Sequence, residues 1–161
     1  MISLVRIDDR LIHGQVVEAW VPALGIERVV VVCDHASADE MQAALMRMAL
    51  PERVELEIVP VARGAAAVRR AAEDRRRTLV LAPGPAEVLA LVEAGVSVAT
   101  VNVGGMHHAA GRVQLGKAIF IGKADAKALE SLSSRGVRLE GRAVPSESPA
   151  DVAALVRGAR A

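Results

Sequence analysis

Residues 6–16, RIDDRLIHGQV, gather two arginines, two aspartates and one histidine in a single short segment. The pKa of unperturbed imidazole is about 6.5, so most rings are neutral at pH 7, and a neutral ring nitrogen is a nucleophile. Beside a phosphate site, such a nitrogen can attack phosphorus and carry the phosphoryl group. His13 is therefore the candidate nucleophile. General acid–base catalysis is the competing role, and it would need a second titratable partner in a substrate pocket.

The elements expected around His13 would place it beside an anion site. A strand over residues 2–5 that stops near residue 7, followed by a helix from residue 11 or 12, leaves residues 8–10 as a loop. We then expect His13 in the first helical turn. Unpaired amides at a helix start favour an anion, Arg10 adds a guanidinium suited to phosphate oxygens, and Gly14 leaves the approach open.

The two aspartates of this segment would repel a phosphate if they were unpaired. We therefore expect Asp8 and Asp9 to pair with Arg6 or Arg10, to cap the helix, or to orient the imidazole ring. A histidine that only caps the helix or packs against it is the alternative for His13.

The composition is that of one soluble globular domain over residues 1–161. The chain is 52% hydrophobic and 24% charged, with a formal net charge of +1 and 1% aromatic residues. So few aromatic side chains, and basic residues concentrated only in the short run 75–77, argue against nucleic acid as a partner. The single cysteine, Cys33, excludes an internal disulfide and fits a reducing compartment.

Apolar runs alternate with helical patterns along the whole chain. Strands are expected at 2–5, 29–33, 54–59, 78–82, 98–103, 113–115, 118–121 and 137–144. Helices are expected at 13–21 with a stop at Pro22, from a capping box at Ser37 to Pro51, over 62–74, from Gly84 to Gly95, over 124–134, and from a cap at Ser148 to the end. This order predicts an α/β fold with a mostly parallel sheet and helices on both faces. Ligands of such sheets bind beyond the carboxyl ends of the strands.

Several other functional signals are weak. Residues 111–118, GRVQLGKA, approach a P-loop, but Ala118 stands where Ser or Thr would bind magnesium, and the segment itself resembles a strand. No Gly-x-Gly-x-x-Gly follows a strand, and the four histidines show no metal-ligand spacing. We expect neither a metal nor an organic cofactor. Since no stretch approaches the roughly 20 apolar residues of a membrane span, we expect a cytoplasmic protein that reaches the membrane through a partner.

Two motifs carry a resemblance to a known family. RIDDRLIHGQV, followed by VNVGGM at residues 101–106, resembles the IIB component of the mannose/fructose/sorbose family of bacterial sugar phosphotransferase systems. The likeness runs over nearly the whole chain. It implies that His13 accepts a phosphoryl group on Nδ1 from the phosphohistidine of a IIA protein or domain. It also implies that the phosphoryl group passes to a sugar imported by the membrane components IIC and IID, so that the chain is a phosphotransferase subunit.

The resemblance also implies the remaining site residues. Arg10 and the amides of Gly14 and Gln15 would cradle the phosphate. Gly104 and Gly105, expected as a turn after the strand over 98–103, would complete the cradle or would be plain turn residues. Other IIB families use a cysteine, but Cys33, at the end of a buried strand, is expected to serve packing. Family members often form dimers, so a homodimer is possible.

Two alternatives to sugar transport remain open. A regulatory phosphocarrier of the same system, without a permease, would look identical in sequence. A module that binds a sugar phosphate or a nucleotide at the same sheet edge belongs to a different class, and its binding would survive the loss of His13.

Overall fold

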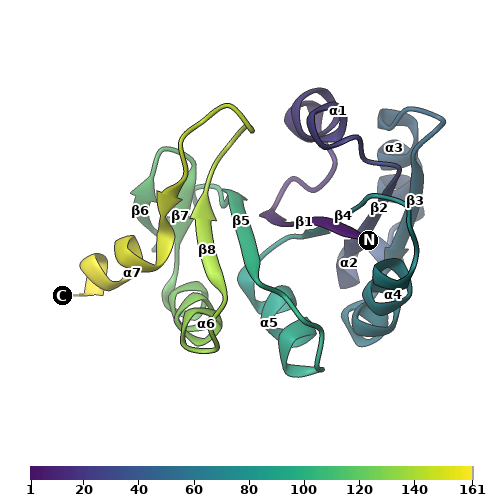
Figure 1. Ribbon diagram of the computed structural model, residues 1–161. Helices are drawn as coiled ribbons and strands as arrows, with labels where there is room; N and C mark the ends of the chain where they lie inside the picture. Colours follow the sequence, from purple (N-terminus) through teal and green to yellow (C-terminus); the bar gives the residue numbers. More distant parts are fainter. Residues whose placement is uncertain (161) are drawn as a thin grey trace.

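The valine-rich and leucine-rich runs form the centre of a seven-stranded sheet in the computed structural model, which describes residues 1–160 (Figure 1). The strands are β1 (Ile2–Asp8), β2 (Arg28–Val32), β3 (Glu55–Val59), β4 (Thr78–Ala82), β5 (Thr100–Gly105), β6 (Val113–Gly116), β7 (Ile119–Ile121), β8 (Arg138–Gly141) and β9 (Ala150–Asp151). The main sheet has the order β3-β2-β4-β1-β5-β8-β9 and is parallel except for β9, while β6 and β7 form a separate antiparallel pair.

Helices cover both faces of the main sheet, so the expected fold class is confirmed (Figure 1). They are a π-helical turn η1 (Val16–Trp20), then α1 (Val21–Leu24), α2 (Asp34–Ala38), α3 (Glu40–Ala49), α4 (Val61–Glu73), α5 (Pro85–Glu93), α6 (Lys123–Ser134) and α7 (Val152–Arg160). Figure 1 shows α1 and α3 above the sheet and α4, α5 and α6 below it. Two hydrophobic clusters fill the layers between helices and sheet. Within residues 1–160, no helix combines the length and apolar character needed to cross a bilayer.

The parallel arrangement gives β1 a central position. β1 pairs with β4 on one side and with β5 on the other, so the carboxyl ends of these three strands meet at one edge of the sheet. The segment that follows β1 therefore emerges between two other strand ends. This is the place at which open α/β sheets bind their ligands.

The caps of three helices differ from the sequence expectation. Cys33 caps α2, and Asp39 caps α3 by accepting a hydrogen bond from the amide of Gln42 at 3.0 Å, so the expected capping box at Ser37 is wrong. Asp39 can serve as the cap because its backbone is extended there, whereas Ser37 already lies inside α2. The last helix begins after Asp151, not after Ser148, because residues 150 and 151 pair with β8 first.

Two further boundaries also differ. The helix expected to stop at Pro22 continues to Leu24, since the π-helical turn lets the amide of Val21 bond to the carbonyl of Val16 and places the proline in the first turn of α1. There its missing N–H costs no hydrogen bond. The strand expected over 137–144 ends at Gly141, because the chain then turns toward the end of β1.

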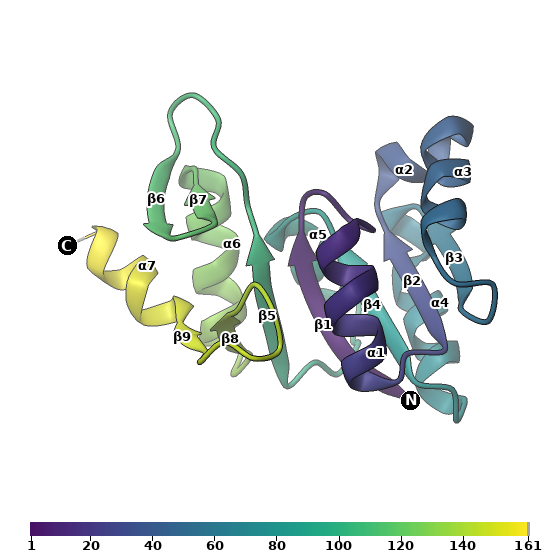
Figure 2. The same ribbon diagram turned by 90° about the horizontal axis from the view of Figure 1, so that it is seen from above.

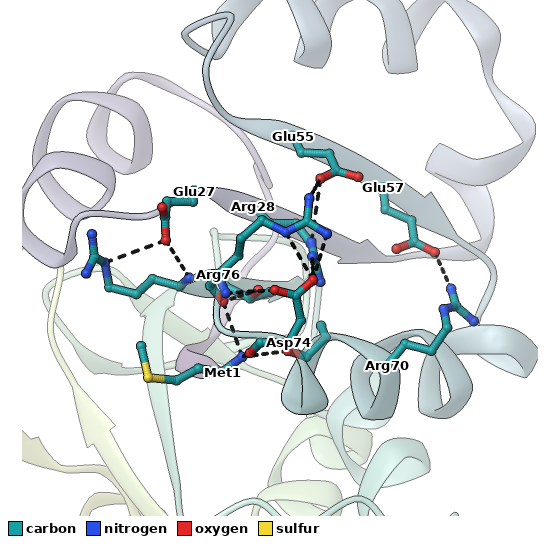
Figure 3. Close-up of polar contacts among 11 residues, drawn as sticks. Met1, Glu27, Arg28, Glu55, Glu57, Arg70, Asp74 and Arg76 are labelled. Carbon is teal, nitrogen blue, oxygen red and sulfur yellow. Dashed lines mark hydrogen bonds and ion pairs between the residues drawn. The ribbon is translucent and has the colours of Figure 1, made fainter.

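An ion-pair cluster lies at the opposite, amino edge of the sheet (Figure 3). Asp74, which follows α4, is the centre of this cluster. Its Oδ2 lies 2.6 Å from the guanidinium of Arg28 in β2 and 2.7 Å from that of Arg76. Arg76 also reaches Glu55 of β3, and Arg70 of α4 reaches Glu57 of the same strand at 2.7 Å. The cluster joins strand starts to helix ends, far along the strands from the segment that follows β1.

Candidate phosphate-transfer site

β1 is longer than expected, and this changes the position of Asp8. The strand extends to Asp8, whose carbonyl accepts a hydrogen bond from the amide of Leu11 at 2.9 Å and whose Oδ1 accepts one from the amide of Arg10 at 3.1 Å. Asp8 is therefore the last strand residue, not part of the loop, and its side chain closes the turn in the manner of an Asx turn.

The turn contains the one non-glycine residue with positive φ among the described residues. Leu11 has a φ of 57°, yet its side chain is buried in the core. Left-handed backbone costs an ordinary residue roughly 1–2 kcal/mol, so the packing of Leu11 and the bonds to Asp8 must hold the turn in place. Because the turn uses Leu11, helical structure begins only at Gly14, and His13 lies just before the helix, not inside its first turn.

His13 is held by Asp8. Its Nε2 lies 3.0 Å from Oδ2 of Asp8, and its side chain is 16% exposed. The carbonyl of His13 accepts a hydrogen bond from the amide of Val17 at 3.0 Å, so His13 is the residue that directly precedes the helix. Since an ionised carboxylate can only accept, Nε2 carries the proton and Nδ1 of the neutral ring is left with a free electron pair.

A buried arginine holds Asp8 in turn. The guanidinium of Arg6 is fully buried, and its Nη2 lies 3.0 Å from Oδ2 of Asp8 and 3.1 Å from the side-chain oxygen of Gln15. Its other acceptors are the side-chain oxygen of Asn102 and the carbonyls of residues 142 and 143, at 2.9 and 3.1 Å. The ring of Trp20 stacks on it at 5.1 Å. A buried charge is tolerable only with such a set of partners.

The electrostatics keep Asp8 ionised. Burial acts to raise the pKa of its carboxyl group, but the hydrogen bond from His13 and the charge of Arg6 outweigh burial, and the pKa lies below its usual value. Burial also lowers the pKa of the Arg6 guanidinium, against the charge of Asp8. An arginine pKa is so high that Arg6 stays protonated nonetheless. The site therefore contains a fixed negative charge beneath the imidazole.

Gly104 and Gly105 are the last residues of β5, so the expectation of a turn at these positions is wrong. Both are buried beneath the charged pair. A Cβ at Gly104 would lie 2.0 Å from the guanidinium carbon of Arg6, and one at Gly105 would lie 3.1 Å from the carboxylate of Asp8. Close approach of two side chains, not turn geometry, is therefore the physical reason for the two glycines. That their own amides bind phosphate stays a prediction.

The proposed phosphate ligands lie in the segment around His13. The side chain of Arg10 is 45% exposed, with Nε 3.7 Å from Oδ1 of Asp8. Gly14 is exposed, and a Cβ there would meet no atom within 4 Å. The amides of Gly14 and Gln15 belong to the first helical turn, where amides have no acceptor within the helix. A guanidinium thus precedes His13 in the sequence, and helix-start amides follow it.

Asp9 contributes to a different part of the edge. Its carboxylate accepts hydrogen bonds from the amide of His107, at 2.7 Å, and from the ring of the same residue. It lines a cavity of about 300 Å³ together with Gly84, Glu87 and Arg112, and His13 is not among the residues that line it. The structure thus pairs Asp9 with His107 across two strand ends, whereas Asp8 holds the imidazole.

Several residues around Arg6 were not predicted as site residues. Trp20, Asn102 and the backbone of residues 142 and 143 surround Arg6, although they are 14 to 137 positions away from it along the chain. The glycine pair at 104 and 105, directly after the strand expected over 98–103, was an available signal, because a pair of glycines in a buried strand indicates close approach of other groups. Cys33 is buried as the cap of α2, in agreement with its expected packing role.

Comparison with known proteins identifies relatives along the whole chain. A family model described as "PTS system sorbose subfamily IIB component" matches residues 2–161. The fructose-specific EIIB component of Bacillus subtilis (strain 168) is 37% identical over 156 residues, which cover 97% of this chain and 96% of that protein. The mannose-specific EIIAB component of Escherichia coli (strain K12) is 36% identical over 147 residues, which cover 91% of this chain and 46% of that protein. The chain thus spans about half the length of this second relative.

Solved structures of IIB components share the fold of this chain. The crystal structure of the IIBSor domain of the sorbose permease from Klebsiella pneumoniae superposes with a TM-score of 0.91 at 32% identity, covering 98% of this chain and 97% of that one. The N-acetylgalactosamine-specific IIB component 1 of Escherichia coli superposes with a TM-score of 0.86 at 29% identity, covering 92% and 97%.

Proposed function

The chain belongs to the sorbose subfamily of IIB components of the sugar phosphotransferase system, and we propose that His13 is its phosphoryl carrier. The observation that carries the proposal is the hydrogen bond between Nε2 of His13 and Oδ2 of Asp8. It leaves Nδ1 as the free ring nitrogen of a residue that follows Arg10 by three positions and directly precedes a helix. Proteins of this family are subunits of sugar phosphotransferases.

Transfer to His13 needs no proton movement at the ring. In the proposed step, the P–N bond of a donor phosphohistidine breaks while a bond forms between phosphorus and Nδ1 of His13. The proton on Nε2 stays in place, so the ring of His13 becomes cationic. Asp8, already ionised and fixed by Arg6, stabilises that positive charge, much as a buried aspartate stabilises the imidazolium of a catalytic triad. In the second step, a sugar hydroxyl forms the O–P bond, the Nδ1–P bond breaks, and the hydroxyl proton is released.

The phosphoryl oxygens need positive partners outside the ring. Arg10 can offer a charge-assisted contact, because its guanidinium is half-exposed and lies next to the same carboxylate that holds His13. The amides of Gly14 and Gln15 can offer hydrogen bonds from the helix start. Positioning and electrostatics of this kind are the main contributions to a phosphoryl-transfer reaction.

The partners follow from the proposed chemistry and from the relatives. The donor is a phosphorylated IIA protein or domain, a proposal supported by the EIIAB name of the Escherichia coli relative. The acceptor is a sugar imported by the membrane components IIC and IID, supported by relatives named as fructose-, sorbose- and mannose-specific. The side chain of His13 is partly exposed, which suits a donor that is itself a protein.

The direct test is to incubate the purified chain with a phosphorylated IIA protein and to measure intact mass under conditions that preserve phosphohistidine. The wild type should gain one phosphoryl group, and His13→Ala should gain none. His35→Ala, a change at an exposed histidine bonded only to Gln42 among the described residues, should behave like the wild type. Modification of His13→Ala, or none of the wild type, would refute the proposal. Saturable binding of a sugar phosphate that persists in His13→Ala would indicate a binding module instead.

A further inference from the structure

Lysine and arginine are distributed very differently along this chain. Of its 20 basic residues, only three are lysines, and all three fall between positions 117 and 127. Lys117 lies in the turn between β6 and β7, and Lys123 and Lys127 lie one helical turn apart at the start of α6. The arginines elsewhere form most of the ion pairs of the molecule.

The lysines of α6 border an open apolar groove. The groove has a volume of about 570 Å³, and its walls include Val113, Ile121, Lys123, Ala126 and Lys127. Val113 is 58% exposed, one of the few large apolar side chains at the surface. We call these five residues the lysine groove. It is formed by one strand of the β6–β7 hairpin, the end of the other, and the first turns of α6.

The two lysines of the groove are uncompensated. Neither Lys123 nor Lys127 forms an ion pair or hydrogen bond with another side chain within residues 1–160. The nearest acidic residue in sequence, Asp125, is engaged elsewhere: it accepts a hydrogen bond from the amide of Gly122 at 2.9 Å and lies 3.7 Å from Arg112. The groove therefore presents positive charge beside apolar surface.

The hairpin that carries the groove is fixed to the edge of the sheet where β1 ends. The amide of Met106, directly after β5, donates to the carbonyl of Ala118 at 2.9 Å, and the amide of Phe120 donates to the carbonyl of Met106 at 2.7 Å. Figure 2 shows β6 and β7 beside α6 and α7, at the side of the molecule away from α3. Binding at the groove would therefore leave the opposite side of the sheet free.

We propose that the lysine groove docks the protein on a membrane surface that carries anionic lipid headgroups. Lysine is a compact point charge on a long apolar stem, so it can lie along apolar surface while its ammonium group reaches a phosphate. Protein–protein interfaces show the opposite preference, since they are enriched in arginine and depleted of lysine. The groove combines lysine with exposed valine and contains no arginine. Lipid headgroups, and not an acidic protein, are therefore the matching partner.

The expected binding is weak and reversible. Each lysine near an anionic surface contributes about 1 kcal/mol, so two lysines change the binding constant about 30-fold. Such an affinity would raise the local concentration of the carrier at the membrane without holding it there. Vesicle binding at the lysine groove is independent of phosphoryl transfer, because the groove contains neither His13 nor Asp8.

The test is co-sedimentation of the wild-type chain with vesicles of phosphatidylcholine, with and without added phosphatidylglycerol. Binding should require phosphatidylglycerol and weaken as salt concentration rises. The double variant Lys123→Gln/Lys127→Gln should bind about 30-fold more weakly, and Val113→Ser should bind more weakly at unchanged charge. Circular dichroism should show that both variants are folded.

The matched control removes the same charge elsewhere. Arg63 and Arg75 are exposed and form no ion pair among the described residues, so Arg63→Gln/Arg75→Gln should bind vesicles nearly as well as the wild type. Equal loss in both double variants would show that net charge alone drives binding and would overturn the proposal. So would binding to pure phosphatidylcholine, or no binding at all. Normal vesicle binding by the lysine variant, with loss of capture by an acidic protein partner, would indicate a protein-docking surface instead.

Discussion

At the scale of single residues, Asp8 decides which nitrogen of His13 can react. Its Oδ1 closes the turn after β1 through the amide of Arg10, and its Oδ2 holds Nε2 of His13. The same carboxylate therefore sets both the path of the backbone and the tautomer of the ring. The sequence placed an aspartate in this segment but could not distinguish ion pairing, capping and ring orientation. The structure shows that Asp8 pairs with Arg6 and holds the imidazole ring, whereas its contact with the amide of Arg10 closes a turn and caps no helix.

Replacement of Asp8 by asparagine should slow phosphorylation of His13 roughly hundred-fold, the order of effect when one preorganised electrostatic contact is lost. An asparagine side chain can donate to Nε2 and so favour the tautomer with the proton on Nδ1, and it cannot stabilise the cationic ring. Rapid-quench measurement of phosphoryl transfer from a phosphorylated IIA protein tests this expectation. Asp39→Asn, at the helix cap of α3, is the matched control and should leave the rate unchanged. A rate for Asp8→Asn within twofold of the wild type would contradict the role of Asp8.

Arg10 should act on the phosphoryl group and not on the fold. Its side chain is half-exposed, and its one ion pair among the described residues is with Asp8. Arg10→Ala should therefore slow transfer about tenfold or more, with little change in the free energy of unfolding. Arg10→Lys should recover part of the rate, since a lysine keeps the charge but not the planar fork. Measured transfer rates and urea denaturation curves check the two expectations, slower transfer and unchanged stability. An unchanged transfer rate in Arg10→Ala would remove this residue from the mechanism.

At the scale of elements, the sequence predicted most strands and helices but not the contacts between them. Continuous β-branched runs such as residues 29–32 identify buried parallel strands, because both faces of such a strand are apolar. The path after β1 was harder to predict, since it depends on the left-handed backbone of Leu11. Leucine is disfavoured there locally, and only burial of its side chain in the finished core makes the turn possible. The order of residue types along the chain contains no information on that burial.

The helix α3 shows the same limit. Met41, Leu45 and Met48 share one face, as their spacing predicts, but that face is exposed by 74, 61 and 81%, and Met46 is the buried residue of the helix. Apolar spacing identifies a helix face without telling which side meets the sheet. No residue within 1–160 covers this stripe.

The end of β5 offers a test of the packing beneath the site. Gly104→Ala would place a methyl group 2.0 Å from the guanidinium carbon of Arg6, which is held by several acceptors and cannot move freely. We expect a loss of about 1–3 kcal/mol in the free energy of unfolding, as for other overpacked cores, and slower phosphorylation because Asp8 loses its fixed partner. Gly158→Ala, where a Cβ would meet no atom within 4 Å, is the control and should be neutral or slightly stabilising. Equal stability of the two variants would contradict this account of Gly104.

At the scale of the whole molecule, the two edges of the sheet carry charged clusters with different tasks. The carboxyl edge holds Asp8, Arg6 and His13, whereas the amino edge holds the cluster around Asp74 (Figure 3). The length of β1 separates them. We therefore expect changes at the amino edge to affect stability and leave phosphoryl transfer intact.

The amino edge should give the protein a measurable acid sensitivity. Hydrogen bonds from Arg76 and Arg28 hold the pKa of the Asp74 carboxyl well below its usual range. A carboxyl group with a lowered folded-state pKa stabilises the fold above its unfolded pKa of about 3.9, and this contribution is lost as pH falls through the folded-state value. The wild type should thus be more stable than Asp74→Asn at neutral pH. The difference between their free energies of unfolding should decrease below about pH 4. Urea denaturation of both proteins at several pH values measures this difference in the free energy of unfolding.

A control variant and a second measurement test whether the effect is specific to Asp74. Glu73→Gln changes a neighbouring exposed carboxylate that forms no ion pair among the described residues. The free energy of unfolding of this variant should be close to that of the wild type at every pH. Phosphorylation of Asp74→Asn by a IIA protein should proceed at the wild-type rate. If the stability difference between the wild type and Asp74→Asn does not depend on pH, or if Asp74→Asn is phosphorylated slowly, the two edges of the sheet do not have separate roles in stability and phosphoryl transfer.

The most direct test of the central claim is to determine which nitrogen of His13 carries the phosphoryl group. Phosphorus–nitrogen coupling in NMR spectra of the ¹⁵N-labelled, phosphorylated protein distinguishes the two ring positions. The contact between Asp8 and Nε2 predicts phosphate on Nδ1 of His13, with a proton retained on Nε2. Phosphate on Nε2, or on any other side chain, would contradict the account.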